Sequence, residues 1–155
     1  MRLCTGGDAS AAAAQREWQT ACLSNSSGTG TTKWSYTTGE LVYESGVCND
    51  RSLYADPEDP MDLPQAWLTD VFEDPGYMGS KECRTTATGI YNLSGNVAEW
   101  TSTAVVALGK TYYRVRGGSY LTYGPTTACD ETFVINLPEF QNHDLGFRCC
   151  SNAAP

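Results

Sequence analysis

The chain has 155 residues, a length that suits one domain with its own hydrophobic core. Its 18 acidic and 10 basic residues leave a net charge of −8, which disfavours binding to nucleic-acid phosphates or to anionic membrane surfaces. No apolar run approaches the roughly 18 residues of a membrane-spanning helix, so we expect no membrane insertion. The single histidine excludes metal sites that need two or three imidazoles.

The seven cysteines are the most informative part of the composition. They are widely spaced and contain no C-x-x-C pair, which argues against a zinc ribbon or a thioredoxin-type redox site. Scattered cysteines in an acidic chain rich in glycine, tyrosine and threonine predict three disulfides and one leftover thiol. The N-terminal residues lack the apolar segment of a signal peptide, but the cysteines predict a secreted, periplasmic or cell-surface protein. They are Cys4, Cys22, Cys48, Cys83, Cys129, Cys149 and Cys150.

The first predicted element is a helix over residues 9–22. Ser10 can cap its N-terminus, alanines favour the helical conformation, and apolar side chains recur on one face as far as Cys22. Residues 24–32 are rich in serine, glycine and threonine, which predicts a polar loop. Residues 55–64 hold three prolines and four acidic residues, which predicts turns rather than a central strand.

The second half of the chain is more strand-like. Residues 111–120 combine β-branched and aromatic side chains and run into a pair of glycines, which predicts a strand. Another short strand is expected over residues 145–150, with irregular loops between the two. These elements together predict an α+β fold with much coil, held by disulfides as well as by a core.

Four segments of the chain, taken in order, carry a resemblance to one protein family. Residues 89–100 read G-I-Y-N-L-S-G-N-V-A-E-W, residues 114–120 read R-V-R-G-G-S-Y, and residues 146–149 read G-F-R-C. Residues 2–5, followed by residues 17–19, resemble R-L-P-T-E-x-E-W-E with an insertion between its halves. The order and spacing of these segments resemble those of formylglycine-generating, or sulfatase-modifying factor, domains.

The resemblance implies a C-type-lectin-like fold in a single domain, residues 1–155, that lacks the family's N-terminal portion. Family members join the cysteine that ends the E-W-E helix to one that follows the G-G-S strand, and a second bridge reaches the cysteine of G-F-R-C. Bridges that close such long loops can each stabilise by roughly 3–4 kcal/mol. In this chain the resemblance implies Cys22–Cys129 and a bond from Cys4 to Cys149 or Cys150, which leaves Cys48–Cys83 as the third pair.

The motif at residues 89–100 offers hard oxygen donors. Asn92 has a side-chain carbonyl and Glu99 a carboxylate, a combination that suits Ca²⁺. In the family this loop binds calcium, and the resemblance places the ligands at Asn92, Gly95, Val97 and Glu99, with Gly95 and Val97 acting through backbone oxygen. The alternative is that Asn92 and Glu99 only cap turns. A second calcium site of the family would fall near Asn49, Asp70 and Phe72, the last through its carbonyl oxygen.

The catalytic members of the family use two cysteines, five residues apart, to bind copper and oxidise a substrate cysteine. The corresponding positions here are Thr122 and Thr127. A threonine hydroxyl is neither a soft ligand for Cu(I) nor a thiol that can exchange with a substrate. Iron-dependent relatives need several histidines, and His143 alone is expected on the surface. We therefore do not expect formylglycine synthesis, and a copper-dependent oxidase of the family is kept as the alternative.

The prediction is instead a non-catalytic module that binds a peptide, a protein or a glycan. Residues 121–144 correspond to the family's substrate groove and mix aromatic with small polar side chains, a composition suited to ligand contact. For Phe133 and Phe140 the alternative is a place in the core. A second alternative is a variable ligand-binding protein of a diversity-generating retroelement, whose variable region would lie in the same segment. The candidate binding residues are Thr122, Tyr123, Thr127, Phe133 and Phe140.

Overall fold

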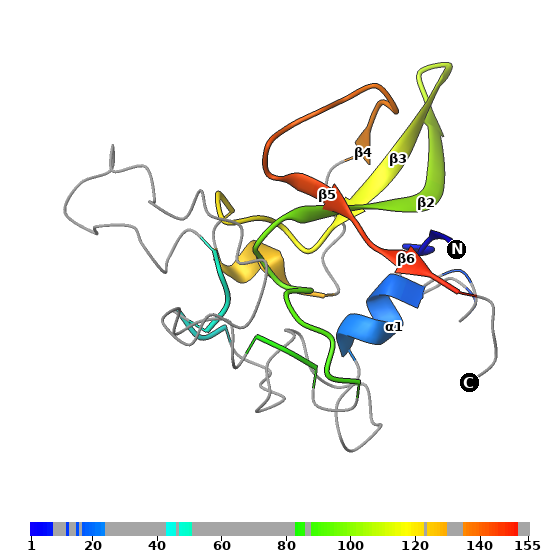
Figure 1. Ribbon diagram of the computed structural model, residues 1–155. Helices are drawn as coiled ribbons and strands as arrows, with labels where there is room; N and C mark the ends of the chain where they lie inside the picture. The colour runs from blue at the N-terminus through cyan, green and yellow to red at the C-terminus, as the bar shows by residue number, and fades with distance from the viewer. Residues whose placement is uncertain are drawn as a thin grey trace, which may run out of the picture.

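The computed structural model describes residues 1–7, 12, 15, 17–23, 43–45, 47–50, 83–85, 88–122, 124–129 and 135–151 (Figure 1). The loops predicted at 24–32 and 55–64 lie outside these residues. The mixture of a short helix with strands is the α+β class that the sequence predicts. In chain order the elements are β1 (Arg2–Leu3), α1 (Glu17–Leu23), β2 (Ala98–Ala107), β3 (Lys110–Arg116), a 3-10 helix (Gly124–Thr127), β4 (Ile135–Asn136), β5 (Leu145–Phe147) and β6 (Cys149–Cys150).

The larger sheet has the strand order β4-β3-β2-β5. Strands β2 and β3 form an antiparallel hairpin whose two-residue turn, Leu108 and Gly109, has positive φ at both positions (51° and 73°). A turn of this kind matches the right-handed twist of the two strands. Strand β5 lies parallel to the start of β2, with Trp100 opposite Phe147, and β4 pairs antiparallel with β3. Figure 1 shows β5 lying along β2, with the hairpin extending beyond it.

The strand predictions are correct in position and inexact in extent. The strand expected over 111–120 is present as β3 but ends at Arg116, before the two glycines. The strand expected over 145–150 is two strands, because the chain leaves the larger sheet at Arg148 and joins a second sheet. In that sheet β6 pairs antiparallel with β1, so the two ends of the described chain lie side by side (Figure 1).

Helix α1 begins at Glu17, not at residue 9, because Thr5 caps it. Glu17 N donates to Thr5 Oγ1 at 3.1 Å, and Thr5 N donates back to the Glu17 carboxylate at 3.0 Å. This reciprocal pairing is that of a capping box, made here by residues twelve positions apart. Ala12 is outside any helix and Gln15 lies in a 3-10 turn, while Ser10 is outside the described residues. Residues 2–5 and residues 17–19, the two halves of the segment that resembles R-L-P-T-E-x-E-W-E, are thus in contact despite the insertion between them.

The described core is built around disulfides rather than around a large aliphatic cluster. Trp18 and Leu93, both buried, pack with cysteines in the larger cluster, and Val47 packs with cysteines in the smaller one. Each cluster therefore combines apolar burial with covalent cross-links between segments far apart in sequence. The buried cysteines are Cys4, Cys22 and Cys129 in the larger cluster and Cys48 and Cys83 in the smaller one.

Three disulfides connect the elements. They are the pairs that the resemblance implies, and the partner of Cys4 is Cys150, which leaves Cys149 as an exposed free thiol. Disulfides persist in oxidising compartments, so these bonds indicate a non-cytoplasmic protein. None of the helices in the described part of the chain is long and apolar enough to cross a membrane. The bonds are Cys4–Cys150, Cys22–Cys129 and Cys48–Cys83.

Candidate functional site

One face of the larger sheet is hollowed. Alternate residues of a strand share a face, so Trp100 of β2, Tyr113 of β3 and Phe147 of β5 lie together, and they line an apolar cavity of about 320 Å³. The β4–β5 connection lies along the same face, because its Pro138 lines this cavity and its Phe140 lines a neighbouring one. On the opposite face of β2, Glu99 accepts a hydrogen bond from Trp18 of α1.

The neighbouring cavity is smaller, about 200 Å³, and more polar. We call it the Asp144 pocket. Its walls come from the start of β2, the end of β3, the segment after the two glycines, β4 and the β4–β5 connection, so it gathers residues from most of the sheet. It is lined by Ala98, Val115, Gly118, Ser119, Thr122, Asn136, Phe140, Asn142, Asp144 and Leu145.

Two hydrogen bonds fix Asp144 in the wall of this pocket. Ala98 N donates to the Asp144 backbone carbonyl at 2.8 Å, which holds the residue beside β2, and Ser119 Oγ donates to Asp144 Oδ2 at 2.7 Å. Burial and then the negative charge of Asp144 raise the pKa of Tyr120. The Tyr120 ring in turn lies 6.1 Å from that of His143, which is exposed, as predicted. The pocket therefore has an oriented carboxylate whose charge reaches its neighbours.

Thr122 and Thr127, the positions that correspond to the family's catalytic cysteines, lie together beside Gly118. A Cβ built on Gly118 would lie 2.9 Å from Thr127 Cγ2 and 3.1 Å from Thr122 Cγ2, so the two threonines flank the same glycine. The Thr122 hydroxyl accepts a hydrogen bond from Ser119 N at 2.9 Å and lines the pocket. Thr127 is fully buried and is not among the described residues that line the pocket, so its predicted contact with a ligand stays a prediction.

The other predicted binding residues divide between the pocket and the undescribed part of the chain. Phe140 is 44% exposed and lines the pocket, so it is not a core residue. Tyr123 and Phe133 lie outside the described side chains. Sequence reasoning missed Ser119 and Asp144, although Ser119 is part of the R-V-R-G-G-S-Y motif and Asp144 lies two residues before the G-F-R-C motif.

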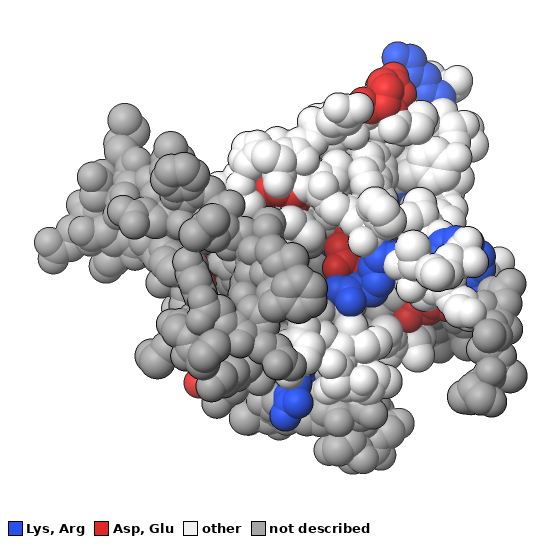
Figure 2. Space-filling model, viewed as in Figure 1, with Lys and Arg blue, Asp and Glu red and all other residues white. Residues whose placement is uncertain are grey.

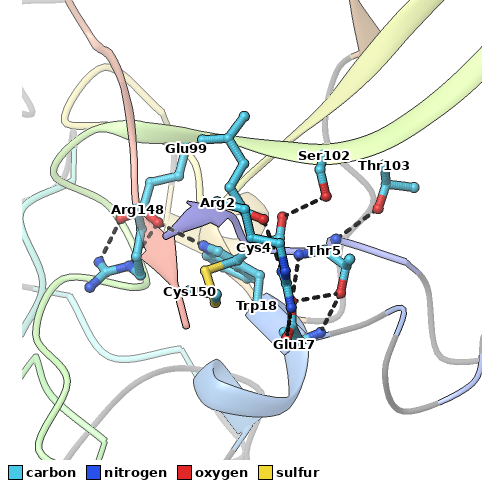
Figure 3. The surroundings of a disulfide bond; sticks show 12 residues. Arg2, Cys4, Thr5, Glu17, Trp18, Glu99, Ser102, Thr103, Arg148 and Cys150 are labelled. Atoms are coloured by element: carbon cyan, nitrogen blue, oxygen red, sulfur yellow. Dashed lines mark hydrogen bonds and ion pairs between the residues drawn. A yellow bond between two sulfur atoms is a disulfide. The ribbon is translucent and has the colours of Figure 1, made fainter. Parts of the chain in front are cut away.

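Glu99, a predicted calcium ligand, already has a cationic partner. Its side chain is 5% exposed, and Arg148 binds both carboxylate oxygens, Nη2 to Oε1 at 2.6 Å and Nε to Oε2 at 2.9 Å. Trp18 Nε1 donates to Oε2 at 2.7 Å, and Arg148 Nη2 also donates to the Tyr91 carbonyl at 3.1 Å. Figure 3 shows the carboxylate between Arg148 and Trp18, with the Cys4–Cys150 disulfide beside them. Because the charge is compensated and both oxygens are engaged, Glu99 does not fit a calcium site in this arrangement.

The rest of the expected calcium loop, residues 89–98, has a sharply turning backbone. Asn92, Gly95 and Asn96 all have positive φ (55°, 75° and 66°), and Gly95 N donates to the Gly117 carbonyl at 2.8 Å. Gly95 is required here, since a Cβ would lie 2.5 Å from the carbonyl oxygen of Asn49. The loop therefore packs on the segment around residue 49. Val97, the remaining expected ligand, is half-buried, and in the described residues no group of three acidic, histidine or cysteine side chains could hold a metal.

Asn49, expected at the second calcium site, has a different environment. The residue is 5% exposed, its Nδ2 donates to Asn96 Oδ1 at 3.1 Å, and its Oδ1 is buried without a hydrogen bond. A buried carbonyl oxygen with no donor is a suitable ligand for a hard cation. Asp70 and Phe72, the other two expected ligands, lie outside the described residues. Asn49 therefore fits calcium ligation where Glu99 does not.

Comparison with known proteins supports the motif assignment. The chain matches the family described as sulfatase-modifying factor enzyme 1-like domain over residues 13–153. It is also similar to two proteins named inactive C-alpha-formylglycine-generating enzyme 2, from Mus musculus and Bos taurus, each 35% identical over 69 residues. That match covers 42% of this chain and 22% and 23% of the two relatives, so the chain spans less than a quarter of their length. Since the family match covers most of the chain, the protein belongs to the sulfatase-modifying factor enzyme 1-like domain family, as a member without the catalytic cysteine pair.

Proposed function

We propose that the protein is a non-catalytic ligand-binding module on a formylglycine-generating-enzyme-like scaffold. The observation that carries this proposal is the pair of threonines, Thr122 and Thr127, on either side of Gly118. Their side chains share one small region, as a metal-binding pair would, but they present hydroxyls instead of thiols. Hydroxyls are poor ligands for Cu(I), so the scaffold keeps the site's shape without its reactive groups.

Two further points support binding without catalysis. The curated relatives carry the word inactive in their names, and this chain is similar to them. The Asp144 pocket also provides a concave surface with polar groups and an exposed aromatic ring, which are features of ligand sites. We propose a peptide, protein or glycan as the ligand. The finer assignments proposed with it are a C-type-lectin-like arrangement of one domain and a secreted, periplasmic or cell-surface location.

Nucleic acid does not fit this proposal. The chain has a net charge of −8, and in the face that Figure 2 shows most of the described surface is uncharged. Basic side chains there occur in small separate groups and form no continuous area within the described surface. A phosphate backbone needs the opposite charge pattern.

A titration with Cu(I) tests the loss of the catalytic pair. Both proteins in the comparison carry Cys149→Ser, because the exposed Cys149 thiol could itself bind Cu(I). One has no other change and the second also carries Thr122→Cys and Thr127→Cys, and the native disulfides of both are first verified by mass spectrometry. We expect the protein with the added cysteine pair to bind one equivalent of Cu(I) and the protein with the two threonines to bind none. Tight, stoichiometric binding by the protein with the two threonines would contradict the proposal. If the folded protein with the added cysteine pair also failed to bind, the premise that these two positions form the metal pair would be wrong.

We further propose that any calcium bound by this protein is held at the Asn49 position and not at Glu99. Calorimetric titration with CaCl₂ of the wild-type protein, Asn49→Ala and Glu99→Gln separates the two positions. Calcium uptake is expected for the wild-type protein and for Glu99→Gln and is expected to be lost in Asn49→Ala. Loss confined to Glu99→Gln, or no uptake by any of the three proteins, would overturn this assignment. Thermal melting of each variant verifies that it is folded.

A further inference from the structure

The Asp144 pocket carries a negative charge that no basic side chain of the described residues compensates. One carboxylate oxygen of Asp144 accepts the Ser119 hydroxyl, and no basic side chain in the described part of the structure forms an ion pair with it. By contrast, Glu99, the buried carboxylate of β2, is held by Arg148. A carboxylate that borders a cavity and has one uncommitted oxygen gains most from a cationic donor.

The pocket holds both donors and acceptors. The Ser119 hydroxyl is committed as a donor to Asp144, the Thr122 hydroxyl accepts from Ser119 N and keeps its own O–H, and the side-chain amides of Asn136 and Asn142 offer N–H groups. The Asn142 side-chain oxygen accepts from His143 N at 2.9 Å, which closes a local turn. Among the described residues that line the pocket, Asp144 is the one charged group, and none is a lysine or an arginine. The ligand groups that pair with a carboxylate and donate several hydrogen bonds to it are ammonium and guanidinium.

The remaining walls are apolar. Ala98, Val115 and Leu145 line the pocket from three neighbouring strands, and the Phe140 ring lies at its side, 44% exposed. Aliphatic walls can cover an alkyl stem, and an aromatic face attracts a nearby cation. A carboxylate, an alkyl-lined wall and an exposed ring together match a long side chain with a charged end better than they match a neutral sugar.

We propose that the Asp144 pocket binds an alkyl cation, the ammonium or guanidinium end of a lysine- or arginine-like chain, with Asp144 as its counter-ion. The inference rests on the proposed function, since it names the ligand chemistry of that binding module. The same chemistry has two sources, a basic side chain in a peptide or a free alkylamine, and the experiment separates them. Burial and, after it, the negative charge of Asp144 raise the pKa of Tyr120, and the second cause agrees with the field that such a site requires.

The test is an NMR titration of the isotope-labelled, disulfide-bonded full chain. The probes are Nα-acetyl-lysine N-methylamide and Nα-acetyl-arginine N-methylamide as peptide-like cations, n-butylammonium as the free amine, and Nα-acetyl-norleucine N-methylamide as the neutral isostere. A neutral methyl glycoside is run in parallel. Backbone amide shifts of Ala98, Gly118 and Leu145 report on occupancy of the pocket. We expect saturable shifts with the cations and at least about tenfold weaker binding of the norleucine probe.

Variants assign the effect to the pocket. Asp144→Asn keeps an acceptor for the Ser119 hydroxyl but removes the charge, and we expect at least about tenfold weaker cation binding. Glu139→Gln is the matched control, because it removes the same charge from an exposed residue of the same connection that does not line the pocket. It is expected to leave binding within about twofold. Should Asp144→Asn fail to fold, Phe140→Leu provides the second test, with a several-fold loss expected from the missing aromatic face.

The outcomes separate this inference from the function on which it rests. Equal binding of the lysine and norleucine probes, or equal losses in Asp144→Asn and Glu139→Gln, would overturn the cation assignment. Shifts with the glycoside alone would also overturn it and leave the binding-module proposal intact. Stronger binding of n-butylammonium than of the two peptide-like cations identifies a free amine, and the reverse order identifies a basic side chain. Oxidation of a cysteine-containing peptide by the protein would instead contradict the proposed function itself.

Discussion

The Glu99–Arg148 pair predicts a large and measurable stability effect. In Arg148→Met the Glu99 carboxylate loses two charge-assisted hydrogen bonds and keeps one, from Trp18. Removing one partner of a buried ion pair costs about 3–5 kcal/mol. The Arg148 side chain is 28% exposed, so water can reach part of the space it leaves. We therefore expect a loss of about 2–4 kcal/mol, a large share of the roughly 5–15 kcal/mol by which domains are stable.

The assay is equilibrium unfolding in urea with the disulfides intact, followed by tryptophan fluorescence and analysed by linear extrapolation. The double variant Arg148→Met, Glu99→Gln removes both charges and keeps an acceptor for Trp18. It should recover about 1–2 kcal/mol relative to Arg148→Met, because no uncompensated charge remains buried. A loss below about 1 kcal/mol in Arg148→Met would refute the reasoning. Strict additivity of the two single variants would refute it as well, since it would show that the pair is not coupled.

Three other predictions concern a disulfide, an ion pair and a loop glycine. Cys150 is disulfide-bonded and Cys149 is free. Cys149→Ser should therefore leave the melting temperature unchanged and remove the one reactive thiol in a thiol assay. Cys150→Ser should lower the free energy of unfolding in urea by about 2–5 kcal/mol. The hydrogen bonds from Arg2 lower the pKa of Glu17 from 4.5 to about 2, so the stability they add is present above about pH 4.5 and is lost as the pH falls toward 2. Acid unfolding of Glu17→Gln should lack that component, and an identical pH dependence in the two proteins would contradict it. Gly95→Ala should cost about 1–3 kcal/mol in thermal or urea unfolding, since its φ is positive and a Cβ would lie 2.5 Å from a backbone oxygen, and an unchanged stability would show that the loop can relax.

Local motifs predicted the parts of the fold that depend on residues close in sequence. The R-V-R-G-G-S-Y and L-G-F-R-C-C segments predicted strands in the correct places, because their β-branched and aromatic residues favour extended backbone. The start of α1 could not be predicted in this way. Its cap, Thr5, lies twelve residues before Glu17, and a pattern that expects a cap immediately before the helix selects Ser10 instead. The sequence predicts no strand at β2, because its first residues belong to the motif that predicts a calcium loop.

In the candidate site, too, only the features that depend on residues close in sequence could be predicted. The replacement of the cysteine pair by Thr122 and Thr127 could be read from the sequence alone, since it depends on counting from a recognised motif. The role of Glu99 could not, because its partner Arg148 is 49 residues away and meets it only through the parallel pairing of β2 and β5. Asp144 is a further example, because its contact with Ser119 spans 25 residues. Long-range pairing decides which charges are compensated, and one sequence does not encode it in a local pattern.

The absence of catalysis is tested most directly by mass spectrometry of a cysteine-containing peptide after incubation with the protein, reduced copper, a thiol reductant and oxygen. A catalytically active formylglycine-generating enzyme, run in parallel, establishes that the conditions support the reaction. The account predicts that this protein leaves the substrate cysteine unchanged, because Thr122 and Thr127 provide no thiolate for copper or for exchange with the substrate. Multiple-turnover formation of formylglycine in the peptide would contradict it.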